Sequence, residues 1–225
     1  MKIEPVIELT ADGSHTLFVP EMNEHYHSVN GAIQESTHIF INAGLHHCRK
    51  DNLTILEIGF GTGLNAFLTL LDIKNTNKKV NYISLEAYPL SETIIKKLNY
   101  SEKSSYEDKE SFYKLHTARW GEREQILSNF SLTKIERNLL QFNFSEITDK
   151  ADIIYFDAFA PDKQPEMWNQ QIFDNLFTIA DDHAILVTYC AKGQVRRSLQ
   201  QAGFTTERLP GPPGKREMLR ATKNS

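Results

Sequence analysis

The chain has 225 residues, of which 40% are hydrophobic and 24% are charged, and its formal net charge is -4. This length suffices for one large α/β domain, and the negative balance gives no global sign of nucleic-acid binding, so an RNA site has to be a local patch. The two cysteines, Cys48 and Cys190, exclude a disulfide framework and a C-x-x-C metal site. We find no signal-peptide core and no run of membrane-spanning length, and therefore expect a cytoplasmic protein.

Residues 1–50 predict a small N-terminal extension ahead of a main domain at 51–225. Apolar residues on both sides of Asp12-Gly13 predict a hairpin over residues 6–19. Apolar residues at 39–45 then predict an amphipathic helix that leads into the main domain.

A polar segment at residues 24–36 separates this hairpin from the helix. Its His25 and His27 have the i, i+2 spacing of a pair of metal ligands on a strand. No further ligand lies nearby at a suitable spacing, so we expect no metal site. The segment is better explained as a polar cover over the mouth of a binding site.

Residues 53–65 predict a strand, a glycine turn and a helix in direct succession. Leu53 to Ile58 is a short apolar run, typical of a strand buried on both faces. Gly59, Gly61 and Gly63 follow, and the apolar residues from Leu64 onward have helical spacing. Residues without Cβ let a ligand approach the backbone, and the helix N-terminus presents unpaired N–H groups.

The spacing of these glycines distinguishes between ligand classes. A dinucleotide site requires G-x-G-x-x-G, whereas the glycines here alternate and Glu57 stands two residues before the first. A carboxylate in the turn favours a cationic ligand over a diphosphate. The E-x-G-x-G-x-G pattern resembles the first motif of class I methyltransferases, which hold S-adenosylmethionine. The alternative is a tight turn without a ligand.

Two further strands are expected to point at the same crevice. Residues 80–85 predict a strand that ends in Glu86, where an acid is placed to accept both hydroxyls of a ribose, or else to begin a helix. The polar run at 99–111 predicts an exposed loop or the polar end of a helix. Residues 134–142 predict a third strand that ends at Asn143, the position from which methyltransferase folds commonly contact the adenine.

The fourth strand, at residues 151–156, is followed by Asp157-Ala158-Phe159-Ala160-Pro161. Asp157 stands at the carboxyl end of the strand, where a carboxylate can bind an ammonium group and orient the free amine as it loses its proton. Phe159 is placed to stack on an acceptor base. The alternative is that Asp157 only caps the next turn.

The C-terminal third predicts a helix from residue 165, a strand at 184–189, a helix that ends at Ala202-Gly203, and an antiparallel pair of strands at 204–209 and 218–222. The predicted fold is therefore α/β, of the Rossmann-like class I methyltransferase type, with a mostly parallel sheet that ends in an antiparallel hairpin. This region also carries an excess of basic residues. They form either a surface that contacts a phosphate backbone or an ordinary solvated surface. The residues are Lys192, Arg196, Arg197, Arg208, Lys215, Arg216 and Arg220.

Beyond the glycine turn, the motifs resemble the methyltransferase half of the bifunctional tRNA 5-methylaminomethyl-2-thiouridine biosynthesis proteins, the MnmC family. The resemblance covers nearly the whole chain and rests on the segments 26–28, 57–65, 157–161, 195–204 and 215–219. The chain departs from the family at Ala158, where a glycine is usual, and at Asn143-Phe144, in place of Gly-Asp.

The resemblance implies transfer of a methyl group from S-adenosylmethionine to the exocyclic amine of 5-aminomethyluridine, with or without 2-thiolation, at the tRNA wobble position. It implies a stand-alone form without the flavin-dependent oxidase half. The alternatives are a small-molecule N- or O-methyltransferase and a non-catalytic RNA-binding module on the same fold.

The site residues follow from the motifs, the strand ends and the resemblance together. Asp157 is the expected catalytic residue. The cofactor is expected to bind at Glu57, Gly59, Phe60, Gly61, Gly63, Asn65, Glu86, Ala87 and Asn143. The substrate is expected to bind at Tyr26, Glu35, Phe159, Lys192, Arg196, Arg197, Lys215 and Arg216.

Overall fold

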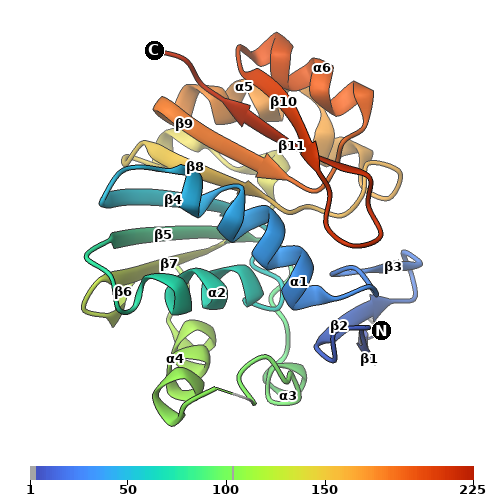
Figure 1. The fold of residues 1–225 in the computed structure, drawn as a ribbon, viewed down its shortest axis with the longest axis vertical. Coiled ribbons are helices and arrows are strands. Elements are labelled where there is room, and N and C mark those ends of the chain that lie inside the picture. The colour runs from blue at the N-terminus through green and yellow to red at the C-terminus, as the bar shows by residue number, and fades with distance from the viewer. Residues whose placement is uncertain (1–3, 103) are drawn as a thin grey trace.

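A mostly parallel, eight-stranded sheet forms the centre of the computed structural model, which describes residues 4–102 and 104–225 (Figure 1). The strand order is β10-β11-β9-β8-β4-β5-β7-β6; β7, β5, β4, β8 and β9 are parallel, while β6, β11 and β10 pair antiparallel. This confirms the predicted fold class. The strands are β4 Asn52–Ile58, β5 Lys79–Glu86, β6 Arg123–Leu127, β7 Phe130–Glu136, β8 Ala151–Phe156, β9 Ala180–Thr188, β10 Thr205–Pro210 and β11 Glu217–Thr222.

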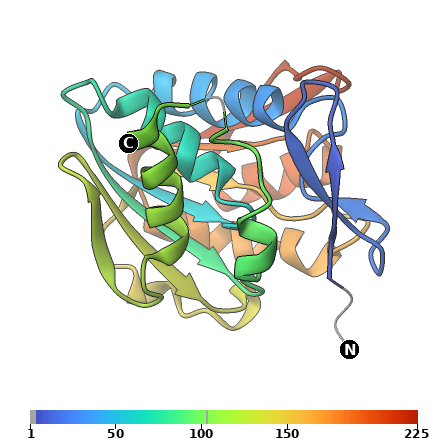
Figure 2. The same ribbon diagram turned by 90° about the horizontal axis from the view of Figure 1, so that it is seen from below.

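Helices cover both faces of this sheet (Figure 2). The α-helices are α1 Ala32–Ser36, α2 Leu64–Ile73, α3 Glu92–Ile95, α4 Tyr106–Thr117, α5 Gln170–Ile179 and α6 Gly193–Ala202. The shorter elements are a π-helix, η1 Thr37–Asn42, and the 3-10 turns η2 Leu45–His47, η3 Leu139–Gln141, η4 Phe144–Glu146 and η5 Pro165–Trp168.

Successive residues of the central strands belong to opposite faces, as the period of two requires. Ile153 and Tyr155 pack in the layer that contains α2 and α4, whereas Ile154 and Phe156 pack in the layer that contains α5 and α6. All four side chains are buried completely. The continuous apolar run that predicted β8 thus reflects a strand covered on both sides.

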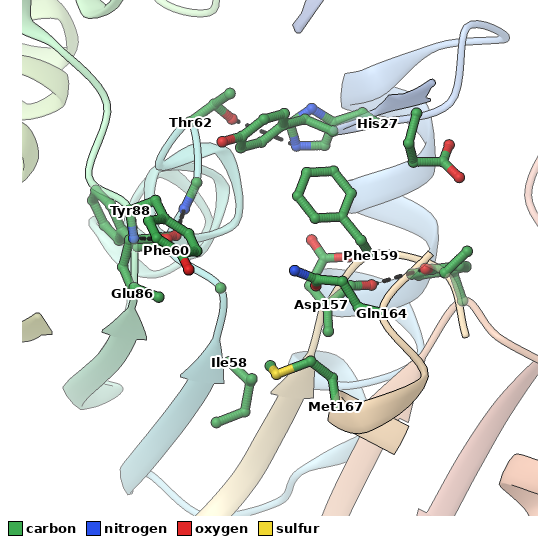
Figure 3. Close-up of a pocket in the computed structure, with 18 of the residues that line it drawn as sticks. His27, Ile58, Phe60, Thr62, Glu86, Tyr88, Asp157, Phe159, Gln164 and Met167 are labelled. Atoms are coloured by element: carbon green, nitrogen blue, oxygen red, sulfur yellow. Dashed lines mark hydrogen bonds between the residues drawn. The ribbon is translucent and has the colours of Figure 1, made fainter. Parts of the chain in front are cut away.

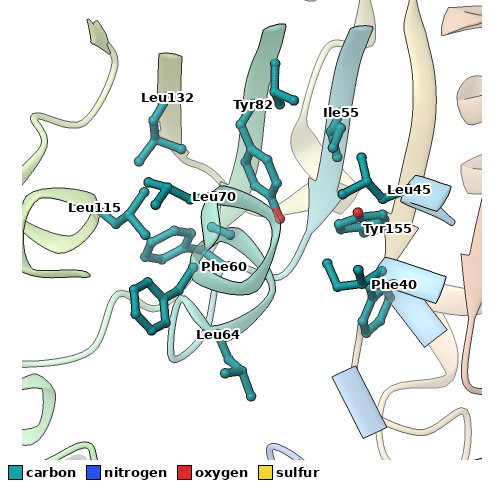
Figure 4. Close-up of a cluster of buried hydrophobic side chains, with 14 of the residues drawn as sticks. Phe40, Leu45, Ile55, Phe60, Leu64, Leu70, Tyr82, Leu115, Leu132 and Tyr155 are labelled. Atoms are coloured by element: carbon teal, nitrogen blue, oxygen red, sulfur yellow. The ribbon is translucent and has the colours of Figure 1, made fainter. Parts of the chain in front are cut away.

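The N-terminal extension shares the core of the main domain. Phe40 and Leu45 belong to the same apolar cluster as Ile55 and Tyr155, and the rings of Phe40 and Tyr155 lie 5.0 Å apart (Figure 4). Since burial of apolar area is the dominant favourable term in folding, this contact fixes the extension against the sheet.

The predicted hairpin over residues 6–19 is confirmed as β1 Val6–Leu9 paired with β2 His15–Val19, and β2 also pairs with β3 Glu24–His25. In its turn, Asp12 accepts hydrogen bonds from the backbone N–H of Ser14 at 2.9 Å and from that of Gln34 at 3.0 Å. The second bond ties the turn to α1, so the hairpin has a defined place beside the sheet.

The third strand was predicted in the wrong place. It is β7, at Phe130–Glu136, rather than residues 134–142, and its antiparallel partner β6 was not predicted. A buried position of β7 is occupied by Lys134, a lysine that is only 1% exposed. The polar run at 99–111 contains the first half of α4, which begins at Tyr106.

The C-terminal elements are confirmed, including the end of α6 at Gly203, which adopts a φ of 113°. No helix in the described part of the chain is long and apolar enough to cross a membrane.

Substitution of Gly203 by alanine should lower the free energy of unfolding by about 2 kcal/mol or more, because a left-handed residue with a Cβ costs about 1–2 kcal/mol. In addition, the new Cβ would lie 2.7 Å from Cζ of Phe177. Gly13→Ala is the matched control, since its φ is 81° and no atom lies within 4 Å of the added Cβ. Urea unfolding that shows equal losses in the two variants would contradict the steric part of this prediction.

Candidate active site

A cavity of about 480 Å³ lies at the carboxyl ends of the parallel strands (Figure 3). Ile58 of β4, Glu86 of β5 and Asp157 after β8 contribute to its lining, and residues 24–29 of the N-terminal extension cover it. Its volume is in the range of small-molecule and cofactor sites. The expected convergence of the strand ends at one crevice is therefore observed.

The glycine turn adopts backbone conformations that require glycine. Gly59, Gly61 and Gly63 have φ values of 94°, 49° and 70°. A Cβ on Gly59 would lie 2.8 Å from the carbonyl oxygen of Asp157, and one on Gly61 would lie 3.1 Å from the ring of Tyr26. The absence of side chains lets the turn approach both the neighbouring strand end and the cover of the cavity.

Glu86 connects the glycine turn to the loop after β5. Its carboxylate accepts hydrogen bonds from the backbone N–H of Gly61 and from that of Tyr88, each at 2.8 Å. These bonds hold the carboxylate at the edge of the cavity, where its remaining lone pairs can accept the hydroxyls of a ribose.

Asp157 lies in the cavity lining and accepts a hydrogen bond from Nδ2 of Asn65 at 2.9 Å. Burial, and secondly the charge of Glu35, raise the pKa of Asp157 to about 7, against the lowering effects of Asn65 and Lys215. A carboxyl group with this pKa can gain and lose a proton at neutral pH.

Aromatic side chains contact the loop that follows Asp157 and fix it. The rings of Tyr26 and Phe159 meet edge to face at 5.1 Å. Nε1 of Trp168 donates to the carbonyl of Phe159, and the hydroxyl of Tyr189 donates to that of Ala158, each at 2.8 Å. The loop is therefore held from two sides, and the rings offer flat apolar surface next to a carboxyl group.

An ion pair joins the two ends of the chain at the cavity wall. Nζ of Lys215 lies 2.6 Å from Oε1 of Glu35 and 4.7 Å from the ring centroid of Tyr189. The other oxygen of Glu35 accepts from the backbone N–H of Ser28 at 2.7 Å. Both charges are mostly buried, so solvent and salt screen this pair less than one at the surface.

Glu57 lies beneath the glycine turn rather than in the cavity lining. It is completely buried and accepts a hydrogen bond from the hydroxyl of Ser84 at 2.7 Å. Burial raises its pKa to about 8, so at neutral pH it is mostly a neutral acid. This placement differs from the expected role of Glu57 as a charged contact to a cationic ligand.

The structure brings eleven of the expected site residues into one cavity lining: Tyr26, Glu35, Gly59, Phe60, Gly61, Asn65, Glu86, Ala87, Asp157, Phe159 and Lys215. Gly63, at the start of α2, lies outside it with Glu57 and Asn143. The side chain of Asn143 accepts from the backbone N–H of Ser145 at the start of η4, since β7 ends at Glu136, seven residues before Asn143.

The remaining basic candidates, Lys192, Arg196, Arg197 and Arg216, also lie outside the cavity lining. Several members of the basic region are paired with acids of the same chain. The pairs are Lys192 with Asp162, Lys215 with Glu35, Arg208 with Glu217 and Arg220 with Glu207. Pairing reduces the positive charge that this region can offer to a phosphate backbone.

Sequence reasoning missed the wall formed by residues 137–140 and Tyr88. These residues follow β7 and β5, and placing β7 correctly would have indicated the first four. Tyr88 and Leu140 are 57% and 44% exposed beside the cavity, and exposed apolar side chains at a cleft are typical of a ligand surface.

The two histidines of the cover have separate environments. Nε2 of His25 lies 2.9 Å from a carboxylate oxygen of Glu8, whereas His27 is buried, with its pKa lowered to about 4 by burial. Among the residues that the structure describes, no group of three or more histidines, cysteines or acids is placed to hold a metal ion.

The fold and this cavity define a methyltransferase. A family model described as S-adenosyl-L-methionine-dependent methyltransferase matches residues 107–224, and the chain belongs to that family. The residues fit the group that the family implies, because a tight glycine turn, an acid at the end of β5 and a cavity of suitable volume lie together.

Two curated relatives of the chain have the same name. The chain is 35% identical over 206 residues to the tRNA 5-methylaminomethyl-2-thiouridine biosynthesis bifunctional protein MnmC of Leptospira borgpetersenii (86% of this chain, 31% of that protein). It is 31% identical over 217 residues to the protein of the same name from Campylobacter hominis (92% of this chain, 31% of that protein). The chain thus spans about a third of the length of these curated relatives.

Solved structures with a similar fold are also known. The crystal structure of MNMC2 from Aquifex aeolicus is similar with a TM-score of 0.82 and 28% identity, covering 96% of this chain and 70% of that chain. Spermidine synthase from Thermotoga maritima, at a TM-score of 0.58 and 12% identity over 100% of this chain and 81% of that one, shares the fold alone.

The buried acid Glu57 should make folding stability depend on pH. Its folded pKa of about 8 lies above the ordinary value of 4.5, so the folded state binds more protons and wild-type stability falls as pH rises from 4.5 to 8. In Glu57→Gln, the loss of unfolding free energy between pH 5 and pH 8 should be smaller by a few kcal/mol, since one pKa unit corresponds to about 1.4 kcal/mol. Urea unfolding of both proteins at pH 5 and pH 8 checks the difference, and equal slopes would contradict a neutral buried Glu57.

Proposed function

We propose that this chain transfers a methyl group from S-adenosylmethionine to the exocyclic amine of 5-aminomethyluridine, with or without 2-thiolation, at the tRNA wobble position in the cytoplasm. The observation that carries the proposal is Asp157, a carboxyl group with a pKa of about 7 in a cavity that Tyr26 and Phe159 also line. Similarity to proteins named for this tRNA modification supports the choice of substrate.

The cofactor side of the cavity consists of the glycine turn and the end of β5. We assign the ribose hydroxyls to Glu86, which is held by Gly61 and Tyr88, and the adenine to the wall at residues 137–140. When bound, S-adenosylmethionine supplies a methyl group already activated by its sulfonium charge. The protein therefore has to orient the acceptor rather than activate the methyl group.

The acceptor side consists of Asp157, Tyr26 and Phe159. An alkyl ammonium is held by the carboxylate of Asp157, which accepts one proton from it and leaves the nitrogen lone pair available for the methyl carbon. Asn65 fixes the carboxyl group for this role through its 2.9 Å hydrogen bond. The rings of Tyr26 and Phe159 provide apolar surface for a nucleobase next to that amine.

One observation favours the second candidate, a small-molecule N-methyltransferase. Lys192, Lys215, Arg208 and Arg220 are paired with acids of the chain, which leaves a weaker phosphate footprint than the sequence indicates. In this candidate the same Asp157 would act on a free amine.

The first test is methyl transfer from labelled S-adenosylmethionine to tRNA from a strain blocked before this methylation, with nucleoside analysis by mass spectrometry. Label in methylaminomethyluridine is the expected result. Absence of label in tRNA, with cofactor binding shown by calorimetry, would contradict the tRNA substrate and favour the small-molecule candidate.

Asp157→Asn should lower kcat by about 100-fold, the lower end of the usual contribution of a general base, while the Kd for S-adenosylmethionine changes little. In the wild type, kcat should fall as pH drops below about 7, because Asp157 becomes protonated, and the variant should lack this dependence. Asp162→Asn, on the same loop but paired with Lys192 outside the cavity lining, is the matched control. Full turnover by Asp157→Asn would remove the proposed role.

A further inference from the structure

Lys134 of β7 is a buried cation that contacts the ring of Phe60 in the glycine turn. The residue is 1% exposed, and its Nζ lies 4.6 Å from the ring centroid of Trp120 and 5.3 Å from that of Phe60. Nζ also donates to the carbonyl oxygen of His116 at 2.5 Å. The ammonium thus has two aromatic faces and one carbonyl around it, and it lies outside the cavity lining.

The carbonyl of His116 belongs to the last turn of α4, where helix carbonyls have no partner within the helix. A cation at this end is favoured by the helix dipole as well as by the hydrogen bond. Burial lowers the pKa of Lys134 to about 8, against the raising effect of Glu124. The ammonium form that donates to His116 is therefore present at neutral pH.

The imidazole of His116 continues this contact to the glycine turn. Its Nε2 lies 3.1 Å from the carbonyl oxygen of Thr62, so this nitrogen carries the proton and donates. Burial, and then the charge of Lys134, lower the pKa of His116 to about 3, which keeps the ring neutral. A Cβ on Gly63 would lie 2.9 Å from the same Nε2, so the ring contacts the turn closely.

Phe60 contacts both Lys134 and His116 through its ring and connects them to the cavity. Its ring meets His116 at 5.5 Å and Trp120 at 6.2 Å, and it also lines the cavity. Contacts from Lys134 and His116 therefore converge on residues 60–63, the stretch whose backbone has to keep a positive φ at Gly61 and Gly63. A shift of either residue would change the shape of the turn.

We propose that Lys134 and His116 are positioning residues, which hold the glycine turn in the shape that binds the cofactor. Lys134 fixes the end of α4 through the carbonyl of His116, and the imidazole of His116 fixes the turn through the carbonyl of Thr62. The inference rests on the proposed function in one respect, namely that this turn holds S-adenosylmethionine.

The experiment compares Lys134→Met, His116→Phe and His116→Gln in the full chain by calorimetric titration with S-adenosylmethionine. Lys134→Met and His116→Phe should raise the Kd about tenfold, which corresponds to the loss of one hydrogen bond in a buried site. His116→Gln keeps a nitrogen donor at the position of Nε2 and should restore affinity to within about threefold of wild type. At saturating cofactor, the KM for the methyl acceptor should stay unchanged in all three.

Hydrogen exchange of the amides at residues 59–65 provides a readout that does not need the cofactor. Exchange should be faster in Lys134→Met and His116→Phe and close to wild type in His116→Gln. Lys79→Met is the control for loss of a lysine, because Lys79 begins β5 and Glu86, at the other end of that strand, lies at the cavity. If Lys134→Met does not fold, the two His116 variants decide.

Equal affinity and equal exchange in His116→Phe and wild type would overturn the inference, as would equal losses in His116→Phe and His116→Gln. Failure of the wild type to bind S-adenosylmethionine would instead contradict the proposed function. In that case the exchange rates at 59–65 still decide whether Lys134 and His116 hold the turn.

Discussion

The contact between Gly59 and Asp157 is the constraint on which the site depends. The ends of β4 and β8 are joined by the parallel ladder and by the bond from the N–H of Asp157 to the carbonyl of Ile58. A Cβ on Gly59 would lie 2.8 Å from the carbonyl oxygen of Asp157, so the turn can leave β4 against the end of β8 only with a glycine at this position. The approach brings Asn65, at the start of α2, within hydrogen-bond distance of the Asp157 side chain. The glycine turn and the carboxyl group for which we propose a catalytic role are thus fixed by the same packing.

Burial sets the protonation states of the carboxyl groups in and near the site. Glu57 and Asp157 both have raised pKa values because burial disfavours their ionised forms. Glu35 keeps a cationic partner, Lys215, and this pair closes one wall of the cavity. The cavity therefore holds one carboxyl group with a raised pKa, Asp157, beside the ion pair of Glu35 and Lys215, which suits an acceptor that has to lose a proton.

The cavity has two sides with different supports. The side proposed for the acceptor is fixed by hydrogen bonds from Trp168 and Tyr189 to the loop after β8. The side proposed for the cofactor is supported by α4 and β7 through His116 and Lys134. Because the supports come from separate layers of the fold, substitutions in one should affect one ligand more than the other.

The sequence by itself determined the features that are encoded by local patterns. The strand, turn and helix at 53–64, the acids at the ends of β5 and β8, and the C-terminal hairpin follow from strand runs, glycine spacing and turn residues that need no distant partner. Tertiary structure alone decided the burial of Glu57, the pairing of Glu35 with a lysine 180 residues away, and the place of β7. In β7, a lysine occupies an inward position because a carbonyl and two rings compensate its charge, and no local pattern of apolar residues can indicate such a partner.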